Sequence, residues 1–370
     1  MATAELVSEL VAIPSVNPDL VPGGAGEAEV AAYVAGWLRD AGLEVEVDEA
    51  ASGRPSVVAV ARGRGGGRSL ILNGHLDTVG VEGMERPFVP DIRDGRLYGR
   101  GGYDMKAGVA ACMIAARRLA AEDLAGDVIL TAVADEEYAS IGTQSVLKRW
   151  TADAAIVTEP TALRVCVAHK GFVWAELETA GRAAHGSRPA EGVDAITRMA
   201  PALGRLADLQ AALDAAPGHE LVGPGSVHAS LIEGGQELSS YPARCVLSLE
   251  RRTEPGESAD DFRNECEALV EGIDGAEVRM GLVRPPFSVD REEPVVAAVT
   301  RAAEAVTGAR PEVYGETYWM DAALTQAAGI PTVVFGPGGE GAHSVGEWVD
   351  LRSVDACAEG LVLAARELCG

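Results

Sequence analysis

Aromatic residues, basic residues and long apolar runs are all scarce in this chain of 370 residues. Phe, Trp and Tyr make up 5% of it, and 31 Lys and Arg stand against 56 Asp and Glu, which gives a net charge of −25. Nucleic acids and anionic membranes are bound by basic surfaces, so we expect neither as a partner. No stretch approaches the roughly 18 consecutive apolar residues that a membrane span requires.

Cysteines are also few, and none forms a CxxC pair. Isolated cysteines with apolar neighbours are typical of reduced core residues rather than of disulfides or metal ligands. The first residues, MATAELVSELVAIP, contain neither a basic segment nor a long apolar one, so we expect no signal peptide. We therefore predict a cytoplasmic protein.

The hydrophobic content of 47% suffices for a large core and two domains. Apolar strand signals at 69–80, 128–137 and 152–160 alternate with helical patterns, which is typical of an α/β domain with a mostly parallel central sheet. The segment that follows has the β-α-β-β-α-β order of a ferredoxin-like two-layer unit. We therefore predict an α/β domain formed by residues 1–170 and 284–370, with residues 171–283 inserted as a smaller domain.

Polar side chains follow the strands of the predicted α/β domain. The strand in VILTAVADEE (128–137) ends in three acids, the strand in SLILNGHLDTVG reaches His75 and Asp77, and ADAAIVTEP ends in Glu159. Taken alone, the three acids also fit a solvated loop. Ligands and catalytic groups collect beyond the carboxyl ends of strands in such sheets, so the recurrence favours a site.

Asp104 has two possible roles. It ends the hairpin and glycine turn of GRLYGRGGYD (95–104) and precedes a helix predicted at Met105–Ala120. An aspartate at that position can cap the helix N-terminus, and it can equally serve as a bridging metal ligand. The sequence alone does not decide between them.

Histidines and carboxylates together are the ligands that zinc prefers, and cobalt or manganese can take the same geometry. Two divalent ions would be neutralised by three ligating carboxylates and one hydroxide, with both histidines neutral, as a partly buried cavity requires. Two of the seven candidates then remain: one carboxylate beside a bound water as general base, and Asp77 as the partner of His75. The seven are His75, Asp77, Asp104, Glu136, Glu137, Glu159 and His343.

The chain resembles, in the order and spacing of six motifs, the metallopeptidase family of acetylornithine deacetylase, succinyl-diaminopimelate desuccinylase, aminoacylase and glutamate carboxypeptidase. The motifs are GHLDTV, GRGGYDMKAG, ADEE, TEPT, AAHGSRPAEGVDAI and GPGGEGAHSVGEWV. The resemblance covers essentially the full chain. It implies a catalytic α/β domain with a two-zinc site, and an inserted lid that also forms a homodimer.

The resemblance also implies individual roles. Glu136 would be the general base on a metal-bound water, Asp77 would orient His75, and Asp135 has no assigned task. The metal ligands would be His75 and Glu159 on one ion, Glu137 and His343 on the other, and Asp104 between them.

Substrate contacts are implied for the lid and for one glycine-rich turn. His185 would polarise the scissile carbonyl, in its own or the partner subunit, although a solvated loop histidine is the alternative. Arg252 would bind a substrate carboxylate, to which its planar guanidinium is suited. His228 either faces the pocket or is a surface strand histidine. Backbone N–H groups of the turn that contains Gly336, Gly338 and Gly339 would also meet the carboxylate.

Two positions depart from the family pattern. Ser239 stands where an asparagine is usual, which puts the lid contacts in doubt. Met320 stands before Asp321 where a small hydroxyl residue is common, so the pocket wall differs.

We predict a zinc-dependent hydrolase that cleaves the amide of N-acyl amino acids or related small carboxylates. By resemblance, Glu rather than Asp at position 159 is more usual in deacylases and carboxypeptidases than in aminopeptidases. A carboxypeptidase or dipeptidase is therefore the alternative activity. A catalytically silent binding protein on the same fold would require an incomplete ligand set or a replaced Glu136, and neither is seen.

Overall fold

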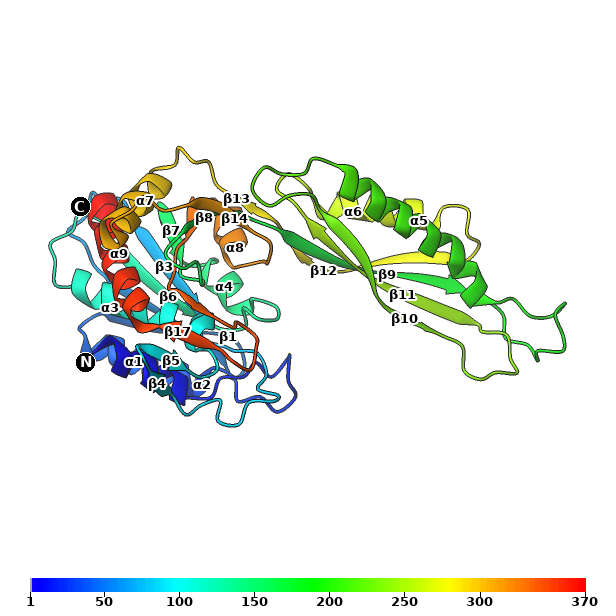
Figure 1. Ribbon diagram of the computed structural model, residues 1–370, viewed down its shortest axis with the longest axis horizontal. Helices are drawn as coiled ribbons and strands as arrows, with labels where there is room; N and C mark the ends of the chain where they lie inside the picture. Colours follow the sequence, from blue (N-terminus) through cyan, green and yellow to red (C-terminus); the bar gives the residue numbers. More distant parts are fainter. Residues whose placement is uncertain (1) are drawn as a thin grey trace. The chain divides into compact units, whose positions relative to one another are not determined.

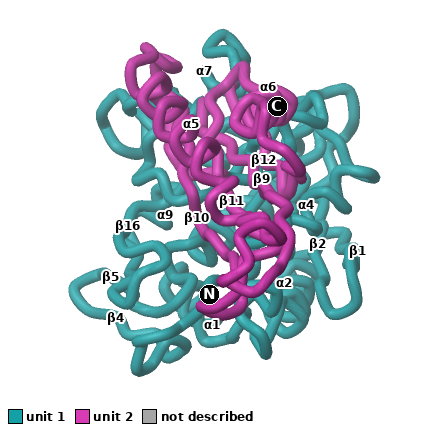
Figure 2. Tube along the Cα trace, turned by 90° about the vertical axis from the view of Figure 1, so that its right-hand side faces the viewer, with its two compact units in different colours: residues 1–167, 289–314, 320–370 teal, residues 168–288, 315–319 magenta. Residues whose placement is uncertain are grey.

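The computed structural model describes residues 2–370 and divides into two compact units (Figure 2). Unit 1 contains the chain up to Val167, together with Val289–Tyr314 and Met320–Gly370. Unit 2 contains Ala168–Ser288 and the short segment Gly315–Trp319. The sequence pattern gave no signal for this last segment, because it is too short to show a periodicity. Within residues 2–370 no helix is long and apolar enough to cross a membrane.

A mixed sheet forms the centre of unit 1, with its strands in the order β1-β2-β6-β3-β7-β15-β8 (Figure 1). Strands β6, β3, β7 and β15 are parallel, whereas β1, β2 and β8 are antiparallel to their neighbours. The predicted α/β class is confirmed, and the parallel pairing is confined to the four central strands. The strands are β1 Glu44–Ala51, β2 Arg54–Ala61, β3 Leu70–His75, β6 Val128–Val133, β7 Ala154–Val157, β8 Val165–His169 and β15 Thr332–Val334.

The helices of unit 1 pack in two groups. Helices α1, α3, α9 and α7 contact one another in succession, and α3 also contacts β3 and β6. Helices α2 and α4 pack on β1 and β2, and α4 contacts α8. Strands β3, β6 and β7 are buried along their whole lengths, and their sequences are mainly apolar, although β3 ends in Asn73, Gly74 and His75. The helices are α1 Thr3–Ala12, α2 Ala28–Asp40, α3 Ala107–Leu119, α4 Ile141–Val146, α7 Pro294–Thr307, α8 Ala322–Ala327 and α9 Leu351–Cys369.

A small antiparallel sheet joins two distant parts of the sequence within unit 1. Its order is β16-β17-β5-β4, and Trp348 pairs with Tyr98. This pairing brings the segment between β16 and β17, which contains His343, beside the glycine turn that follows β5. The strands are β4 Asp91–Arg93, β5 Arg96–Tyr98, β16 Gly339–Glu340 and β17 Trp348–Asp350.

Unit 2 is a four-stranded antiparallel sheet with helices α5 and α6 on one face (Figure 1). The strand order β10-β11-β9-β12 is that of the predicted ferredoxin-like unit. Alternate residues of β9, Val173, Ala175 and Leu177, belong to a buried cluster that includes Met199 of α5 and Phe262 of α6. The elements are β9 Gly171–Ala180, α5 Ala195–Ala215, β10 Ser226–Gly234, β11 Arg244–Thr253, α6 Ala259–Val270 and β12 Ala276–Arg284, followed by β13 Phe287–Ser288 and β14 Val313–Glu316, which pair with β8.

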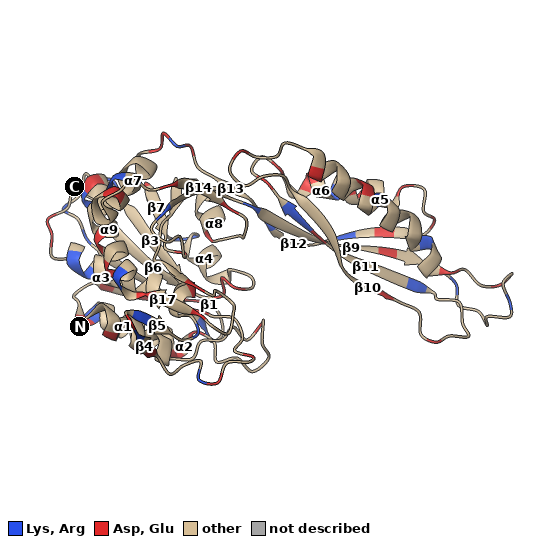
Figure 3. Cartoon of the chain, viewed as in Figure 1, with Lys and Arg blue, Asp and Glu red and all other residues tan. Residues whose placement is uncertain are grey.

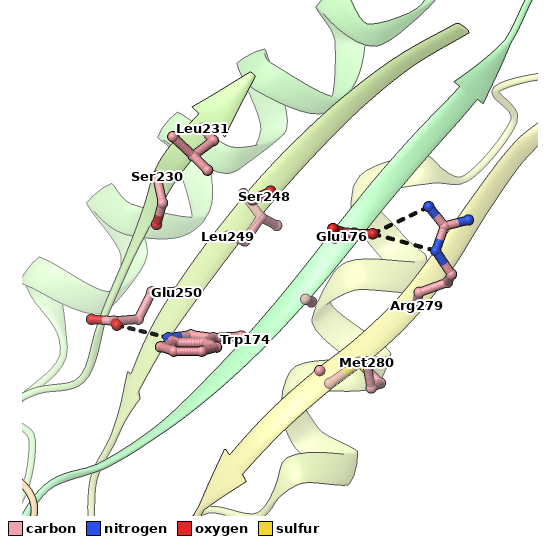
Figure 4. Close-up of a pocket in the computed structure, with 11 residues that line it drawn as sticks. Trp174, Glu176, Ser230, Leu231, Ser248, Leu249, Glu250, Arg279 and Met280 are labelled. Atoms are coloured by element: carbon pink, nitrogen blue, oxygen red, sulfur yellow. Dashed lines mark hydrogen bonds and ion pairs between the residues drawn. The ribbon is translucent and has the colours of Figure 1, made fainter. Parts of the chain in front are cut away.

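The other face of the unit 2 sheet is exposed and carries charged pairs. Arg279 lies 3.2 Å from Glu176 and 2.7 Å from Glu178, and basic and acidic residues are interspersed along these strands (Figure 3). Trp174 Nε1 donates a hydrogen bond of 3.0 Å to Glu250 beside an open pocket of about 560 Å³ (Figure 4). Exposed pairs of this kind contribute little to stability.

Candidate metal centre

Three neighbouring strands of the central sheet end at one place in unit 1. Strands β6, β3 and β7 lie side by side and parallel, and His75, the last residue of β3, pairs with Val133. The three acids follow β6, and Glu159 follows β7. The common carboxyl ends of these strands therefore bring His75, Glu136, Glu137 and Glu159 to the same edge of the sheet.

Two groups of side chains at this edge have the spacing of metal ligands. The first contains His75, Asp104 and Glu159, and the second contains Asp104, Glu137 and His343. His75 Nε2 lies 3.1 Å from Asp104 Oδ1 and 3.6 Å from Glu159 Oε1. His343 Nε2 lies 3.3 Å from Asp104 Oδ2 and 3.1 Å from Glu137 Oε2. Asp104 thus belongs to both groups and presents a different oxygen to each.

These separations fit coordination of a divalent ion. Ligand atoms at 2.0–2.1 Å from a tetrahedral zinc ion are about 3.3 Å apart, which is the spacing found in both groups. Glu137 Oε1 is buried and has no hydrogen-bond partner within residues 2–370. A buried carboxylate oxygen without a donor is costly, and a cation would satisfy it.

The acid–base properties of the cluster also indicate that it needs a cation. Burial, with the nearby carboxylate of Glu159, raises the pKa of Glu136 well above its usual value. Burial likewise raises the pKa of Glu159, despite the lowering effect of His75. Hydrogen bonds that the His343 ring donates to the carboxylates of Asp104 and Glu137 raise the pKa of His343 to about 10. In the absence of metal, the raised pKa values thus favour the protonated forms of Glu136, Glu159 and His343. A bound cation would favour the deprotonated forms of the ligands instead.

Asp104 does not cap the following helix. Helix α3 begins at Ala107 after a short π-helical turn, Gly102–Lys106, and Asp104 itself has extended backbone angles and makes no capping hydrogen bond. The N-cap interpretation is therefore wrong, because the turn lies between Asp104 and the helix and directs its carboxylate toward His75 and His343.

Glu347 holds the backbone that delivers Asp104. Its carboxylate is buried and accepts hydrogen bonds from the backbone N–H groups of Gly101, Tyr103 and Asp104, at 3.1, 2.9 and 3.1 Å. It also forms a 2.5 Å ion pair with Arg100, whose side chain is buried as well. The segment that contains His343 therefore also positions the aspartate shared by both groups.

The orientation of His75 comes mainly from a backbone group. Its Nδ1 lies 3.0 Å from the carbonyl oxygen of Asp77 and 3.6 Å from the Asp77 carboxylate. Donation of the Nδ1 hydrogen to that carbonyl leaves Nε2 with a free lone pair toward Asp104, as a metal ligand requires. The Asp77 carboxylate instead accepts the backbone N–H groups of Glu136 and Glu137, at 3.0 and 3.1 Å.

Glu136 lies beside the two groups and belongs to neither. Its pKa is raised by the same burial and charges that act on the candidate ligands. A carboxylate with a raised pKa next to candidate ligands is suited to accept and return a proton near neutral pH. Glu136 thus differs in position from its neighbour Glu137, which contacts His343 and belongs to the second group.

The predicted contacts from unit 2 lie on its loop and sheet. His185 is exposed, with Nδ1 2.7 Å from Ser187 Oγ. His228 is an exposed residue of β10. Arg252, on β11, donates to Glu250 at 2.7 Å and stacks on Phe172. These positions do not test the roles predicted for the three residues, which stay predictions.

Two of the three N–H groups in the turn of Gly336, Gly338 and Gly339 already have hydrogen-bond partners within the protein. The N–H group of Gly336 donates to Thr161 Oγ1 at 2.9 Å, and that of Gly338 donates to Ser353 Oγ at 2.8 Å. Gly339 belongs to β16 and pairs with β17. Because these groups hold the turn in place, the predicted carboxylate contact is not supported for Gly336 or Gly338.

Several residues at the site carry no signal in the sequence. Asn17 contacts both Asp77 and Asp135, and Arg54 contacts Asp135. Asn17 and Arg54 lie far from the motifs in the sequence, so only folding brings them to the site. Glu347 lies within the motif that contains His343, and its full burial is what distinguishes it from the exposed Glu340 nearby.

Comparisons with known proteins agree with this geometry. The family model described as peptidase family M20/M25/M40 matches residues 71–367. Acetylornithine deacetylase of Salmonella arizonae is 29% identical over 376 aligned positions, which cover 99% of this chain and 97% of that protein.

Solved structures share the fold. An aminopeptidase PepT from Bacillus cereus has a TM-score of 0.82 at 23% identity, covering 100% of this chain and 98% of that one. A dinuclear metal-binding peptidase from Bacillus subtilis has a TM-score of 0.74 at 17% identity, covering 99% and 97%. The match of the family model over most of the sequence confirms the resemblance of the six motifs: the chain belongs to the peptidase family M20/M25/M40, a family of metal-dependent amide-bond hydrolases.

Proposed function

We propose that this amide hydrolase is a two-zinc deacylase that releases the amine from N-acyl amino acids or related small carboxylates. One observation carries the proposal: two groups of candidate ligands share Asp104, and Glu136 lies beside both groups without belonging to either. This is the arrangement that two metal ions and a separate general base require.

A relative's activity supports the deacylase rather than the peptidase alternative. The curated relative with 29% identity over nearly the full length of both chains is an acetylornithine deacetylase. The aminopeptidase and the human carnosine dipeptidase among the solved structures are 23% and 17% identical, so they support the fold alone. A carboxypeptidase or dipeptidase activity therefore remains the alternative.

His75, Asp104 and Glu159 would hold one ion, and Asp104, Glu137 and His343 the other. When bound, the ions would supply a water molecule with a pKa lowered toward about 7 and would polarise the amide carbonyl. Glu136 takes the proton from the attacking water and returns it to the leaving amine, so one carboxyl serves as base and then as acid. Its raised pKa suits the second step, in which it must hold a proton.

Residues of unit 2 complete the proposal. Arg252 binds the substrate carboxylate, and His185 donates a hydrogen bond to the carbonyl oxygen as charge develops on it. The Arg252 guanidinium already stacks on Phe172 and is held by Glu250, so its plane is fixed before a substrate arrives. Preorganisation of this kind reduces the cost of binding.

A homodimer through unit 2 forms part of the same proposal. Strand β10 is at the edge of its sheet and pairs only with β11 among residues 2–370. Its residues Leu231 and Ile232 are 64% and 53% exposed. An exposed apolar edge strand favours pairing with another chain, and a second copy supplies an identical strand. We also propose a cytoplasmic location, which is supported by six buried cysteines that form no disulfide among residues 2–370.

The test compares Glu136→Gln with Glu137→Gln. Glu136→Gln should lower kcat by roughly 10²–10⁴-fold, because general acid–base catalysis contributes that much, while metal content by elemental analysis stays at the wild-type value. Glu137→Gln should lose one ion along with activity. A loss of metal in the Glu136 variant would show that the two roles are wrongly divided.

The substrate class is tested with the wild-type enzyme loaded with zinc or cobalt. N-acetyl, N-succinyl and N-formyl amino acids are compared with dipeptides by kcat/KM. A preference for dipeptides over every N-acyl amino acid would replace the deacylase with the peptidase alternative.

A further inference from the structure

Two fully buried carboxylates, Asp77 and Asp135, lie behind the candidate metal centre and share one donor group. The side-chain amide of Asn17 donates to Asp77 Oδ2 at 2.8 Å and to Asp135 Oδ1 at 2.9 Å. All three residues are completely buried. A primary amide has two hydrogens, so each carboxylate receives one of them.

Both carboxylates hold the turn that contains the general base and a ligand. Asp77 accepts the N–H groups of Glu136 and Glu137. Asp135 accepts the N–H groups of Ala139 and Ile141, at 3.2 and 3.3 Å, on the far side of the same turn. The segment from Glu136 to Ile141 is therefore fixed at its two ends by two different acids.

Two further hydrogen bonds hold Asn17 in place. Its backbone N–H donates to the carbonyl of Thr78 at 2.9 Å, next to Asp77 in the sequence, and its Oδ1 accepts the N–H of Asp19 at 3.0 Å. The carboxamide is thus held by its oxygen, and both N–H groups point to the acids. A neighbouring ion pair supports the arrangement, since Arg54 contacts both Asp135 and Glu27, at 2.8 and 2.7 Å.

The side-chain amide of Asn17 links the two acids directly, through one hydrogen bond to each. Arg54 donates to Asp135, whereas the side-chain donor to Asp77 is Asn17. Without Asn17, Asp77 would lose its link to Asp135, and the Glu136–Glu137 peptide that it holds could shift relative to His75. A shift of about 1 Å at such a centre is enough to reduce catalysis and metal binding substantially.

We propose that Asn17 is a positioning residue, which couples Asp77 to Asp135 and thereby sets the distance of Glu136 and Glu137 from His75. The inference rests on the proposed function for its catalytic part only. Its effect on metal affinity follows from the positions of the candidate ligands and needs no turnover to be measured.

The experiment compares Asn17→Leu with Ser56→Ala in the full chain. Leucine has nearly the shape of asparagine but donates no hydrogen bond to either acid. Ser56 Oγ accepts the N–H of Ala134 at 3.1 Å and contacts neither acid through a hydrogen bond, so its variant removes one buried hydrogen bond at the same strand end. Zinc affinity is measured by competition with a chromophoric chelator, kcat and KM with the best substrate of the panel, and unfolding by heat.

Asn17→Leu should weaken zinc affinity and lower kcat by roughly 10–100-fold each, as loss of a group that supports metal ligands usually does, with KM changed less than about threefold. Ser56→Ala should lower the melting temperature without either effect. Wild-type zinc affinity and kcat in a folded Asn17→Leu enzyme would overturn the proposal and leave Asn17 a purely stabilising residue.

If Asn17→Leu does not fold, Asn17→Ser decides in the same way, because the shorter hydroxyl side chain cannot bridge both acids. If the wild-type enzyme hydrolyses no amide of the panel, the proposed function fails, and the zinc affinities still test the position of the ligands. Equal zinc affinities for wild type and the Asn17 variant would then overturn this inference as well.

Discussion

Replacement of Glu347 by glutamine should weaken both metal sites at once. Glutamine keeps the shape of the side chain but puts an NH₂ group where one carboxylate oxygen now accepts hydrogen bonds from Gly101 or from Tyr103 and Asp104. Because Asp104 gives one oxygen to each candidate group, a shift of its backbone disturbs both. His343→Ala, in contrast, should remove a ligand from one group only.

The size of the effect on stability follows from the burial of the ion pair. Arg100 is 3% exposed, and removal of one partner from a buried pair costs roughly 3–5 kcal/mol. With an unfolding entropy of about 2.1 cal/mol/K per residue over 370 residues, that loss lowers the melting temperature by roughly 4–6 °C. The affinity for each metal ion should fall by roughly 10–100-fold.

The assay is metal content after dialysis against a fixed concentration of free zinc, together with thermal unfolding. Glu340→Gln serves as the control, because Glu340 is an exposed carboxylate of the same segment. We expect wild-type metal content for the control, loss of one ion for His343→Ala and partial loss of both for Glu347→Gln. A Glu347→Gln protein with two tightly bound ions would refute the argument, whatever its melting temperature.

Two further predictions concern pH and assembly. The pKa of His343 in the metal-free protein is raised to about 10, above its value of 6.5 when unfolded, so its contribution to stability is complete below pH 6.5 and is lost as the pH rises through about 10. The melting temperature of the metal-free protein should therefore fall over this pH range, and it should fall less in His343→Ala. Zinc affinity should rise with pH, because zinc binding displaces the imidazole proton. Equal slopes of melting temperature against pH for wild type and His343→Ala would contradict the assignment. Sedimentation velocity should give twice the chain mass, and Leu231→Lys in the exposed edge strand β10 should give monomers, whereas a dimeric variant would exclude this edge as the interface.

The sequence predicted which candidate ligands lie at the ends of strands, because a strand and the residue that follows it are neighbours in the sequence. A buried strand is a continuous apolar run, and the residue after it lies at the edge of the sheet wherever the strand pairs. His75 and Glu159 were found in this way, and the structure brings them to within 3.6 Å of each other. The ferredoxin-like order of unit 2 followed from periodicity for the same reason.

Features that depend on distant pairing could not be predicted. The residues alone did not decide between the two roles of Asp104, and only the resemblance implied a shared metal ligand, because the position of Asp104 depends on Glu347, 243 positions away in the sequence. The N–H group of Gly336 donates to Thr161, which lies in another segment of the chain, so the sequence did not reveal that contact. Hydrogen-bond partners of backbone groups are set by tertiary structure, and composition gives no sign of them.

Asp135 is the first of the three consecutive acids after β6, and only the structure explains its role. Asp135 has a φ of 69°, in the left-handed region, which costs a non-glycine residue roughly 1–2 kcal/mol. Its carboxylate accepts hydrogen bonds from Asn17, Arg54 and the N–H groups of Ala139 and Ile141. At about 0.5–1.5 kcal/mol each, these four bonds outweigh the cost of the backbone conformation.

That conformation is what separates the two glutamates. The chain turns sharply at Asp135, so its side chain points into the core, while Glu137 reaches His343 and Glu136 does not. Glycine at position 135 would relieve the backbone cost and yet lose all four side-chain bonds, and the turn would no longer be anchored to Asn17. Asp135 makes no contact with a candidate ligand side chain. Its backbone conformation is nevertheless what allows Glu136 and Glu137 to have different roles.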